Sequence, residues 1–88
     1  MEYKVFLPSE VVPDAPDINI QLTQWLCKTG DYVVQGDDIA EVTTDKAVYI
    51  VTSPVSGIID KILVEEGNYL DPRQPICVIQ MMNIDKSP

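Results

Sequence analysis

The sequence predicts an all-β fold, a sandwich or flattened barrel with internal pseudo-two-fold symmetry. Valine and isoleucine are abundant and turn residues recur at short intervals, which is typical of short strands, whereas helical periodicity is poor. The chain of 88 residues also matches itself when it is shifted by 37 positions. Such a repeat indicates two copies of one supersecondary unit that pack against each other around a shared core.

The repeat has the same order of features in both halves. An apolar strand is followed by a Gly-Asp or Gly-Asn turn, a tyrosine, a short loop and a second apolar strand. We call two residues that are related by the 37-position shift twin residues. Identical twins include Leu26 and Leu63, Gly30 and Gly67, Tyr32 and Tyr69, and Ile39 and Ile76.

Eight segments have the composition of strands, because β-branched and other apolar residues are concentrated between turn residues. The expected strands are Tyr3–Leu7, Ile18–Leu22, Gln24–Lys28, Asp38–Val42, Ala47–Thr52, Gly57–Ile59, Lys61–Val64 and Pro75–Met81.

Each half contains one break in the two-residue period of a strand. Apolar residues step by three positions from Leu22 to Trp25, and the twin step runs from Ile59 to Ile62. A β-bulge adds one residue to a strand and returns such a pair to one face. We therefore expect bulges at Thr23-Gln24 and at Asp60-Lys61.

The charge of the chain excludes several classes of partner. The net charge is −8 and there is no histidine. Binding to nucleic acid or to an anionic membrane requires a basic face, so neither is an expected partner. No apolar run approaches the ~20 residues that span a bilayer. The N-terminus also lacks the basic and apolar regions of a signal peptide.

The inventory of reactive side chains predicts no catalysis. Without histidine there is no Ser-His-Asp or Cys-His arrangement, and the isolated glycines form no phosphate-binding loop. Cys27 and Cys77 are too few for a zinc site, so no metal is expected. The favoured interpretation is that both are free thiols in a reduced compartment, and the sequence does not exclude a disulfide between them.

Lys46 is the outstanding candidate site. It lies in the tetrapeptide Thr44-Asp45-Lys46-Ala47, between two β-branched stretches, where a tight turn would present it to solvent. The first strand is expected to run toward this end of the fold. The loop that follows this strand, Pro8–Asp17, should therefore lie near the lysine. It carries the acidic residues Glu10 and Asp14 and is a candidate specificity element.

Five short patterns along the chain resemble those of a known family. They are Trp25-x-Cys27-x-x-Gly30-Asp31, Gly36-Asp37-Asp38-Ile39-Ala40-Glu41-Val42, Thr44-Asp45-Lys46-Ala47, Ser53-Pro54-Val55-Ser56-Gly57 and Val64-Glu65-Glu66-Gly67. The family is the lipoyl domains of 2-oxoacid dehydrogenase acyltransferase subunits, and the resemblance covers nearly the whole chain. It implies a flattened barrel of two four-stranded antiparallel sheets.

The resemblance also implies that Lys46 carries lipoic acid in amide linkage, which removes the charge of the lysine. Thr44, Asp45 and Ala47, together with Glu10 and Asp14, would be recognised by the ligase and by other partners. The domain would be a non-catalytic swinging-arm carrier, part of a dihydrolipoyl acyltransferase subunit, and the chemistry would belong to its cofactor.

The partners implied by the resemblance are enzymes that attach or use the lipoyl arm. They are a lipoate–protein ligase or lipoyl transferase, a thiamine-diphosphate-dependent 2-oxoacid decarboxylase, the acyltransferase core and dihydrolipoyl dehydrogenase. The arm would shuttle acyl groups and reducing equivalents between them. The isolated domain is expected to be monomeric, in the cytoplasm of a bacterium or in the mitochondrial matrix of a eukaryote.

The predicted carrier domain spans residues 1–82, and residues 83–88 are expected to be a polar tail or the start of a linker. A first alternative is a biotinyl carrier domain of a carboxylase, which typically has methionines where Asp45 and Ala47 flank the lysine here. A second is an unmodified barrel-type interaction module, as in membrane fusion proteins. Those usually have a long helical hairpin in place of this tight turn.

Overall fold

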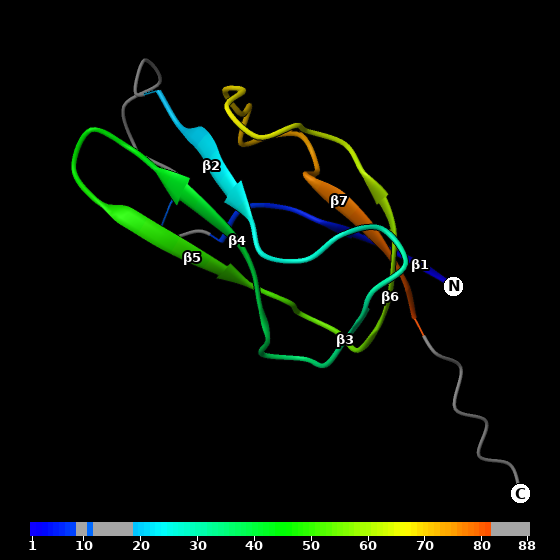
Figure 1. Cartoon of the computed structure of the whole chain (residues 1–88). Helices are drawn as coiled ribbons and strands as arrows, with labels where there is room; N and C mark the ends of the chain where they lie inside the picture. The colour runs from blue at the N-terminus through cyan, green and yellow to red at the C-terminus, as the bar shows by residue number, and fades with distance from the viewer. Residues whose placement is uncertain (9–10, 12–18, 82–88) are drawn as a thin grey trace, which may run out of the picture.

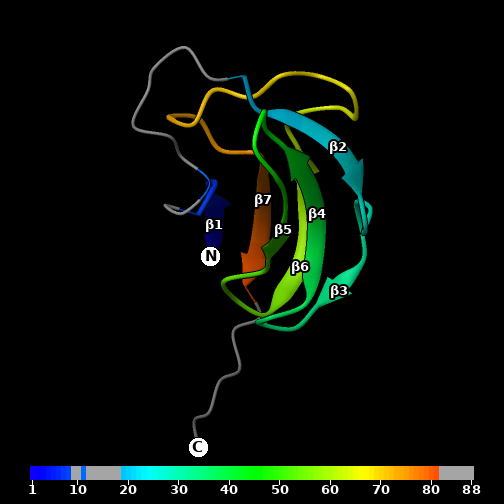
Figure 2. The same cartoon turned by 90° about the vertical axis from the view of Figure 1, so that its left-hand side faces the viewer.

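The computed structural model describes residues 1–8, 11 and 19–81, and within them the fold is all-β (Figures 1 and 2). One antiparallel sheet has the strand order β1-β7-β6-β3 and the other has the order β2-β4-β5. The strands are β1 (Glu2–Val5), β2 (Gln21–Trp25), β3 (Tyr32–Val33), β4 (Asp38–Thr43), β5 (Val48–Thr52), β6 (Gly57–Ile62) and β7 (Cys77–Met81). The predicted class and the two antiparallel sheets are confirmed.

The strand assignments differ from expectation in four places. Gln24–Lys28 is not a separate strand, because β2 continues through its bulge to Trp25. Lys61–Val64 is likewise joined to its predecessor in β6. The two-residue strand β3 was not expected. In the second sheet the place of a fourth strand is held by a single bridge between Gln21 and Tyr69, so that sheet has three strands.

The two expected bulges are confirmed. The pairing of β2 with β4 shifts between Leu22 and Gln24, and the pairing of β6 with β7 shifts between Ile59 and Lys61. Leu22 and Ile59 are both fully buried as a result. Trp25 packs against the same core, which is the outcome that the three-residue step predicted.

The hydrogen bonds show that the two halves exchange equivalent contacts. The Gly30 N–H donates to Ile59 O at 2.8 Å, and its twin Gly67 donates to Leu22 O at 2.7 Å. The bridge of Tyr69 with Gln21 is likewise the twin of the pairing of Tyr32 with Ile58. Because each half binds the other in the same way, the pseudo-two-fold symmetry predicted from the repeat is present in the fold.

The core lies between the two sheets and contains several pairs of twin residues. Its fully buried members include Val42 with Ile79, Ile39 with Ile76, and Ala40 with Cys77. Ser53 is the one buried polar residue among those described, and its hydroxyl donates to Val55 O at 2.6 Å. Burial of these apolar side chains, at about 25 cal/mol per Å², supplies the main driving force for folding.

The ends of the described chain lie away from the β4–β5 hairpin. The Met81 N–H donates to Met1 O at 2.8 Å, which ties the start of β1 to the end of β7. The hairpin lies at the opposite end of the molecule, where β1 ends and β2 begins (Figure 1). The sheets therefore hold this turn at one end of a rigid body, away from both ends of the described chain.

Candidate functional site

Lys46 lies at the tip of the β4–β5 hairpin. The last pair of the ladder is Thr43 with Val48, and the four residues between them form the turn. The Thr44 N–H donates to Ala47 O at 2.9 Å and closes it. The Thr44 hydroxyl accepts from the N–H groups of Lys46 at 3.2 Å and Ala47 at 3.3 Å. This single threonine therefore fixes the backbone on both sides of the lysine.

The side chains of the turn differ in exposure. Thr44 and Ala47 are half-buried at its base, whereas Asp45 and Lys46 are exposed at its tip. Among the described residues the one ion pair joins Arg73 to Asp71, so Lys46 has no carboxylate partner there. A primary amine in this position can be reached by another protein and can be acylated without the loss of an ion pair.

The base of the hairpin is held on both sides. Thr43 pairs with Val48 in β5 and with Gln21 in β2. The Thr43 hydroxyl is also hydrogen-bonded to the hydroxyl of Thr23, the bulge residue of β2. Thr23 and Thr43 were not among the site residues expected from the sequence, because their bond depends on a strand pairing that no local pattern specifies. The outcome is an exposed lysine on a rigid support.

Strand β2 begins at the lysine end of the molecule. Gln21 at the start of β2 pairs with Thr43, next to the turn. Val11, which is described, is buried in the core, and its N–H donates to Pro8 O at 3.0 Å. Glu10 and Asp14 lie outside the described residues, so their predicted role in recognition remains a prediction.

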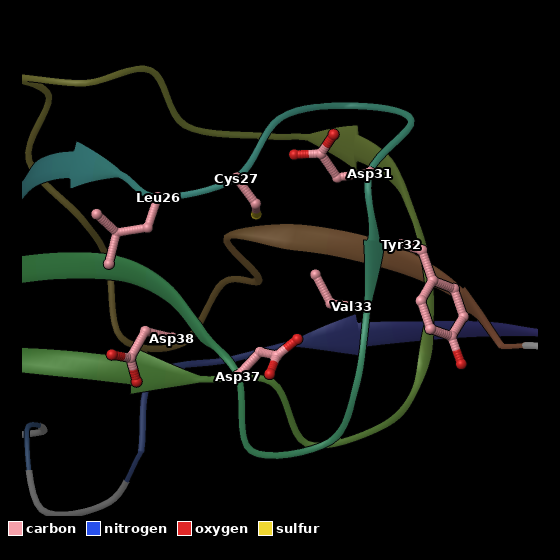
Figure 3. Close-up of a pocket in the computed structure, with 7 residues that line it drawn as sticks. All are labelled: Leu26, Cys27, Asp31, Tyr32, Val33, Asp37 and Asp38. Atoms are coloured by element: carbon pink, nitrogen blue, oxygen red, sulfur yellow. The ribbon is translucent and has the colours of Figure 1, made fainter.

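A shallow hollow lies at the other end of β4, away from the lysine (Figure 3). The Asp31 carboxylate accepts from the Lys28 N–H at 3.0 Å, and the Asp37 carboxylate accepts from the Val34 N–H at 2.9 Å. These two acids therefore stabilise turns. The lining residues are Leu26, Cys27, Asp31, Tyr32, Val33, Asp37 and Asp38.

Both cysteines are free thiols, as expected. Burial, followed by the nearby Cys27, raises the pKa of Cys77 to about 12. Partial burial and the charge of Asp31 also raise the pKa of Cys27. A thiol is nucleophilic as its thiolate, so neither cysteine is activated for chemistry near neutral pH.

Clusters of metal-binding side chains and membrane-spanning helices are both absent from the described part of the chain. It contains no group of three or more histidine, cysteine, aspartate or glutamate side chains placed to hold a metal ion. It also contains no helix of the length and apolar character needed to cross a membrane.

Comparison with known proteins agrees with this geometry. The family model Biotin_lipoyl, described as "Biotin-requiring enzyme", matches residues 12–82. Proteins of Staphylococcus aureus and Staphylococcus epidermidis are 43% identical to this chain over 47 residues, which is 53% of this chain. Both are named dihydrolipoyllysine-residue acetyltransferase component of pyruvate dehydrogenase complex. The match spans only 11% of the length of these relatives.

Proposed function

We propose, since the chain belongs to the Biotin_lipoyl family, that it is a lipoyl carrier domain with Lys46 as its attachment site. Domains of this family are carriers rather than catalysts, and the curated relatives are named for a dihydrolipoyllysine residue. The observation that carries the assignment of the site is the exposed amine of Lys46, at the tip of a turn whose backbone is fixed by Thr44.

The residues of the turn fit a lipoyl group in amide linkage. Acylation of the amine removes its charge, and Lys46 has no carboxylate partner among the described residues that would be left unpaired. When attached, the lipoyl group supplies a dithiolane that takes up an acyl group and reducing equivalents. The part of the chain is to present the lysine, and Thr44 and Thr43 keep the turn and its base in one geometry.

The proposed setting is a 2-oxoacid dehydrogenase complex. The arm would visit a thiamine-diphosphate-dependent decarboxylase, the acyltransferase core and dihydrolipoyl dehydrogenase. Tethering within one assembly gives such an arm a high effective concentration at each active site. The net charge of −8 also favours approach to basic clefts on these partners.

Intact mass after enzymatic modification tests the proposal. The domain is incubated with lipoate, ATP and a lipoate–protein ligase, in parallel with Lys46→Arg, which keeps the positive charge but cannot be acylated by the enzyme. We expect one lipoyl increment in the wild type and none in the variant. A biotin increment with biotin ligase, in place of the lipoyl one, would establish the carboxylase alternative, and an unchanged mass with both enzymes would exclude both carriers.

A further inference from the structure

The outer strands β1 and β5 occupy equivalent places in their sheets. Each pairs along one side only, β1 with β7 and β5 with β4. The bond from Thr44 N–H to Ala47 O before β5 has its counterpart in the bond from Met81 N–H to Met1 O before β1. In both ladders, therefore, the alternation between bonded and unbonded pairs starts at the equivalent position.

The position at which this alternation starts decides which backbone groups of an outer strand point away from its neighbouring strand. In antiparallel pairs, residues alternate between those bonded to the neighbouring strand and those whose N–H and C=O point away from it. Counting from the Thr44–Ala47 pair, the outward residues of β5 are Val48 and Ile50. In β1 they are Glu2 and Lys4. No hydrogen bond between described residues beyond the strand ladders uses these groups.

The side chains at these positions differ in kind between the two edges. A charged residue on an outer strand discourages pairing with a strand of another protein, and β1 has two of them, Glu2 and Lys4. Their counterparts in β5 are apolar and β-branched, although Val48 is 59% exposed and Ile50 is 43% exposed. The edge of β5 thus combines outward backbone groups with exposed apolar side chains, which are the features of a strand-docking site.

The position and charge of this edge indicate its occupant. Val48 follows Lys46 by two residues, so the open edge starts at the attachment site. The exposed Asp45 and the half-buried Glu41, which pairs with Ile50, place negative charge beside it. An unmodified lysine is short, so the enzyme that acylates it must close on the residues next to the turn. Enzymes that use the finished arm react at its far end, so their active sites need not close on the edge of β5, whatever other surface of the domain they recognise.

We propose that the open edge of β5 pairs with an extended segment of the lipoate–protein ligase that acylates Lys46. This inference rests on the proposed lipoyl function. The segment adds a strand next to β5 through the outward N–H and C=O groups of Val48 and Ile50. It covers their side chains with apolar ones and has lysine or arginine facing Asp45 and Glu41.

The first test gives β5 the residues of its counterpart. In the double variant Val48→Glu with Ile50→Lys, we expect kcat/KM for lipoylation to fall about tenfold or more, mainly through KM, because a docking anchor is lost. The control is Glu2→Val with Lys4→Ile, which leaves lipoylation unchanged. Circular dichroism and thermal unfolding are used to check that both variants fold. Wild-type kinetics in the double variant overturn the inference, whereas absence of lipoylation in the wild-type domain overturns the proposed function itself.

The second test observes the backbone directly and needs no change in β5. Amide exchange is measured by NMR for the Lys46→Ala domain, alone and with ligase bound to a non-transferable lipoyl-adenylate analogue. The outward amides of Val48 and Ile50 exchange fast in the isolated domain and gain protection in the complex, whereas Tyr49 and Val51 are protected in both. No gain at Val48 and Ile50 overturns the inference. Concentration-dependent protection without ligase would instead show pairing between two copies of the chain, and also overturns it.

Discussion

The two halves of the molecule close equivalent ladders in different ways. In the first half, Thr44 and Ala47 are joined by the two-residue turn of Asp45 and Lys46. In the second, the corresponding bond is made by Met81 and Met1, which lie at opposite ends of the described sequence. The same backbone bond thus closes a turn with a lysine in one half alone. The repeated fold provides the ladder that supports the turn, and the local sequence Asp45-Lys46 provides the candidate attachment site.

The largest effect of a single substitution is expected at Gly57, the twin of the buried core residue Ile20. A Cβ at Gly57 would overlap the backbone carbonyl of Gln80 and lie 2.8 Å from Ile79 Cγ2. We expect Gly57→Ala to destabilise the domain by about 3 kcal/mol, because the backbone of β7 must shift. The melting temperature, measured by circular dichroism, should fall by roughly 15 °C.

A matched control for Gly57→Ala is Thr52→Ala, at an exposed position of β5. It should change the free energy of unfolding by less than about 0.5 kcal/mol. If Gly57→Ala melts with the wild type, the close approach of β6 and β7 at this position is wrong.

The next largest effect concerns a contact that one half has and the other lacks. The Trp25 indole N–H donates to Val64 O at 2.8 Å, and the Trp25 backbone N–H donates to the Glu66 carboxylate at 2.8 Å. The twin of Trp25 is Ile62, which has no side-chain donor. Trp25→Phe leaves the Val64 carbonyl unpaired and should cost about 1.5 kcal/mol in urea unfolding.

Glu66→Gln is the companion variant, because it keeps an acceptor for the Trp25 N–H. It should be closer to the wild type in stability than Trp25→Phe is. Equal stability of Trp25→Phe and the wild type would show that the hydrogen bond from the Trp25 indole to Val64 O contributes nothing to the free energy of unfolding.

Cys77 and its twin Ala40 provide a comparison in pH. Burial raises the pKa of Cys77 to about 12, so the folded state keeps the thiol protonated while the unfolded state ionises near 9. Below pH 9 both states are protonated, and stability is lost as pH rises from 9 toward 12. Cys77→Ala should cost about 1 kcal/mol at pH 7 through lost packing.

The measurement is denaturant unfolding of the wild type and Cys77→Ala from pH 7 to pH 11. The informative quantity is the difference in the free energy of unfolding between the two proteins at each pH. The advantage of the wild type should shrink above pH 9. A difference that stays constant over the series would contradict a protonated, buried Cys77.

The smallest effect is expected at the Asp71–Arg73 ion pair, at 3.2 Å on the surface. Hydrogen bonds from the Arg73 side chain, then from its backbone N–H, lower the pKa of Asp71. The twin turn has no ion pair, yet the Asp37 N–H donates to Val34 O at 2.9 Å as the Gln74 N–H does to Asp71 O. Arg73→Ala should therefore leave the melting temperature unchanged, and a clear drop would show that the second turn needs its charges.

The structural features that could be predicted from the sequence are those defined by a few consecutive residues or repeated in both halves. The bulges were predicted because the three-residue step occurs twice, at Leu22–Trp25 and at Ile59–Ile62. The lysine turn was predicted because four consecutive residues define it. Strand β3 was missed because two residues, Tyr32 and Val33, are too few to show a period of two.

The remaining features depend on which strands become neighbours. Trp25 and Glu66 lie 41 positions apart, so no local pattern signals their bond. Likewise, the apolar residue Val48 indicates a docking surface only when β5 is known to be an outer strand. The bond between Trp25 and Glu66 and the open edge of β5 therefore follow from the strand topology rather than from the composition.

The most direct test of the account is to locate the lipoyl group by peptide mass spectrometry after reaction with ligase, lipoate and ATP. We predict one lipoyl group per chain, on the peptide that contains Lys46. The other lysines of the chain, Lys4, Lys28, Lys61 and Lys86, should remain unmodified. A lipoyl group on one of these, or spread over several, would contradict the claim that the turn of the first half is the attachment site.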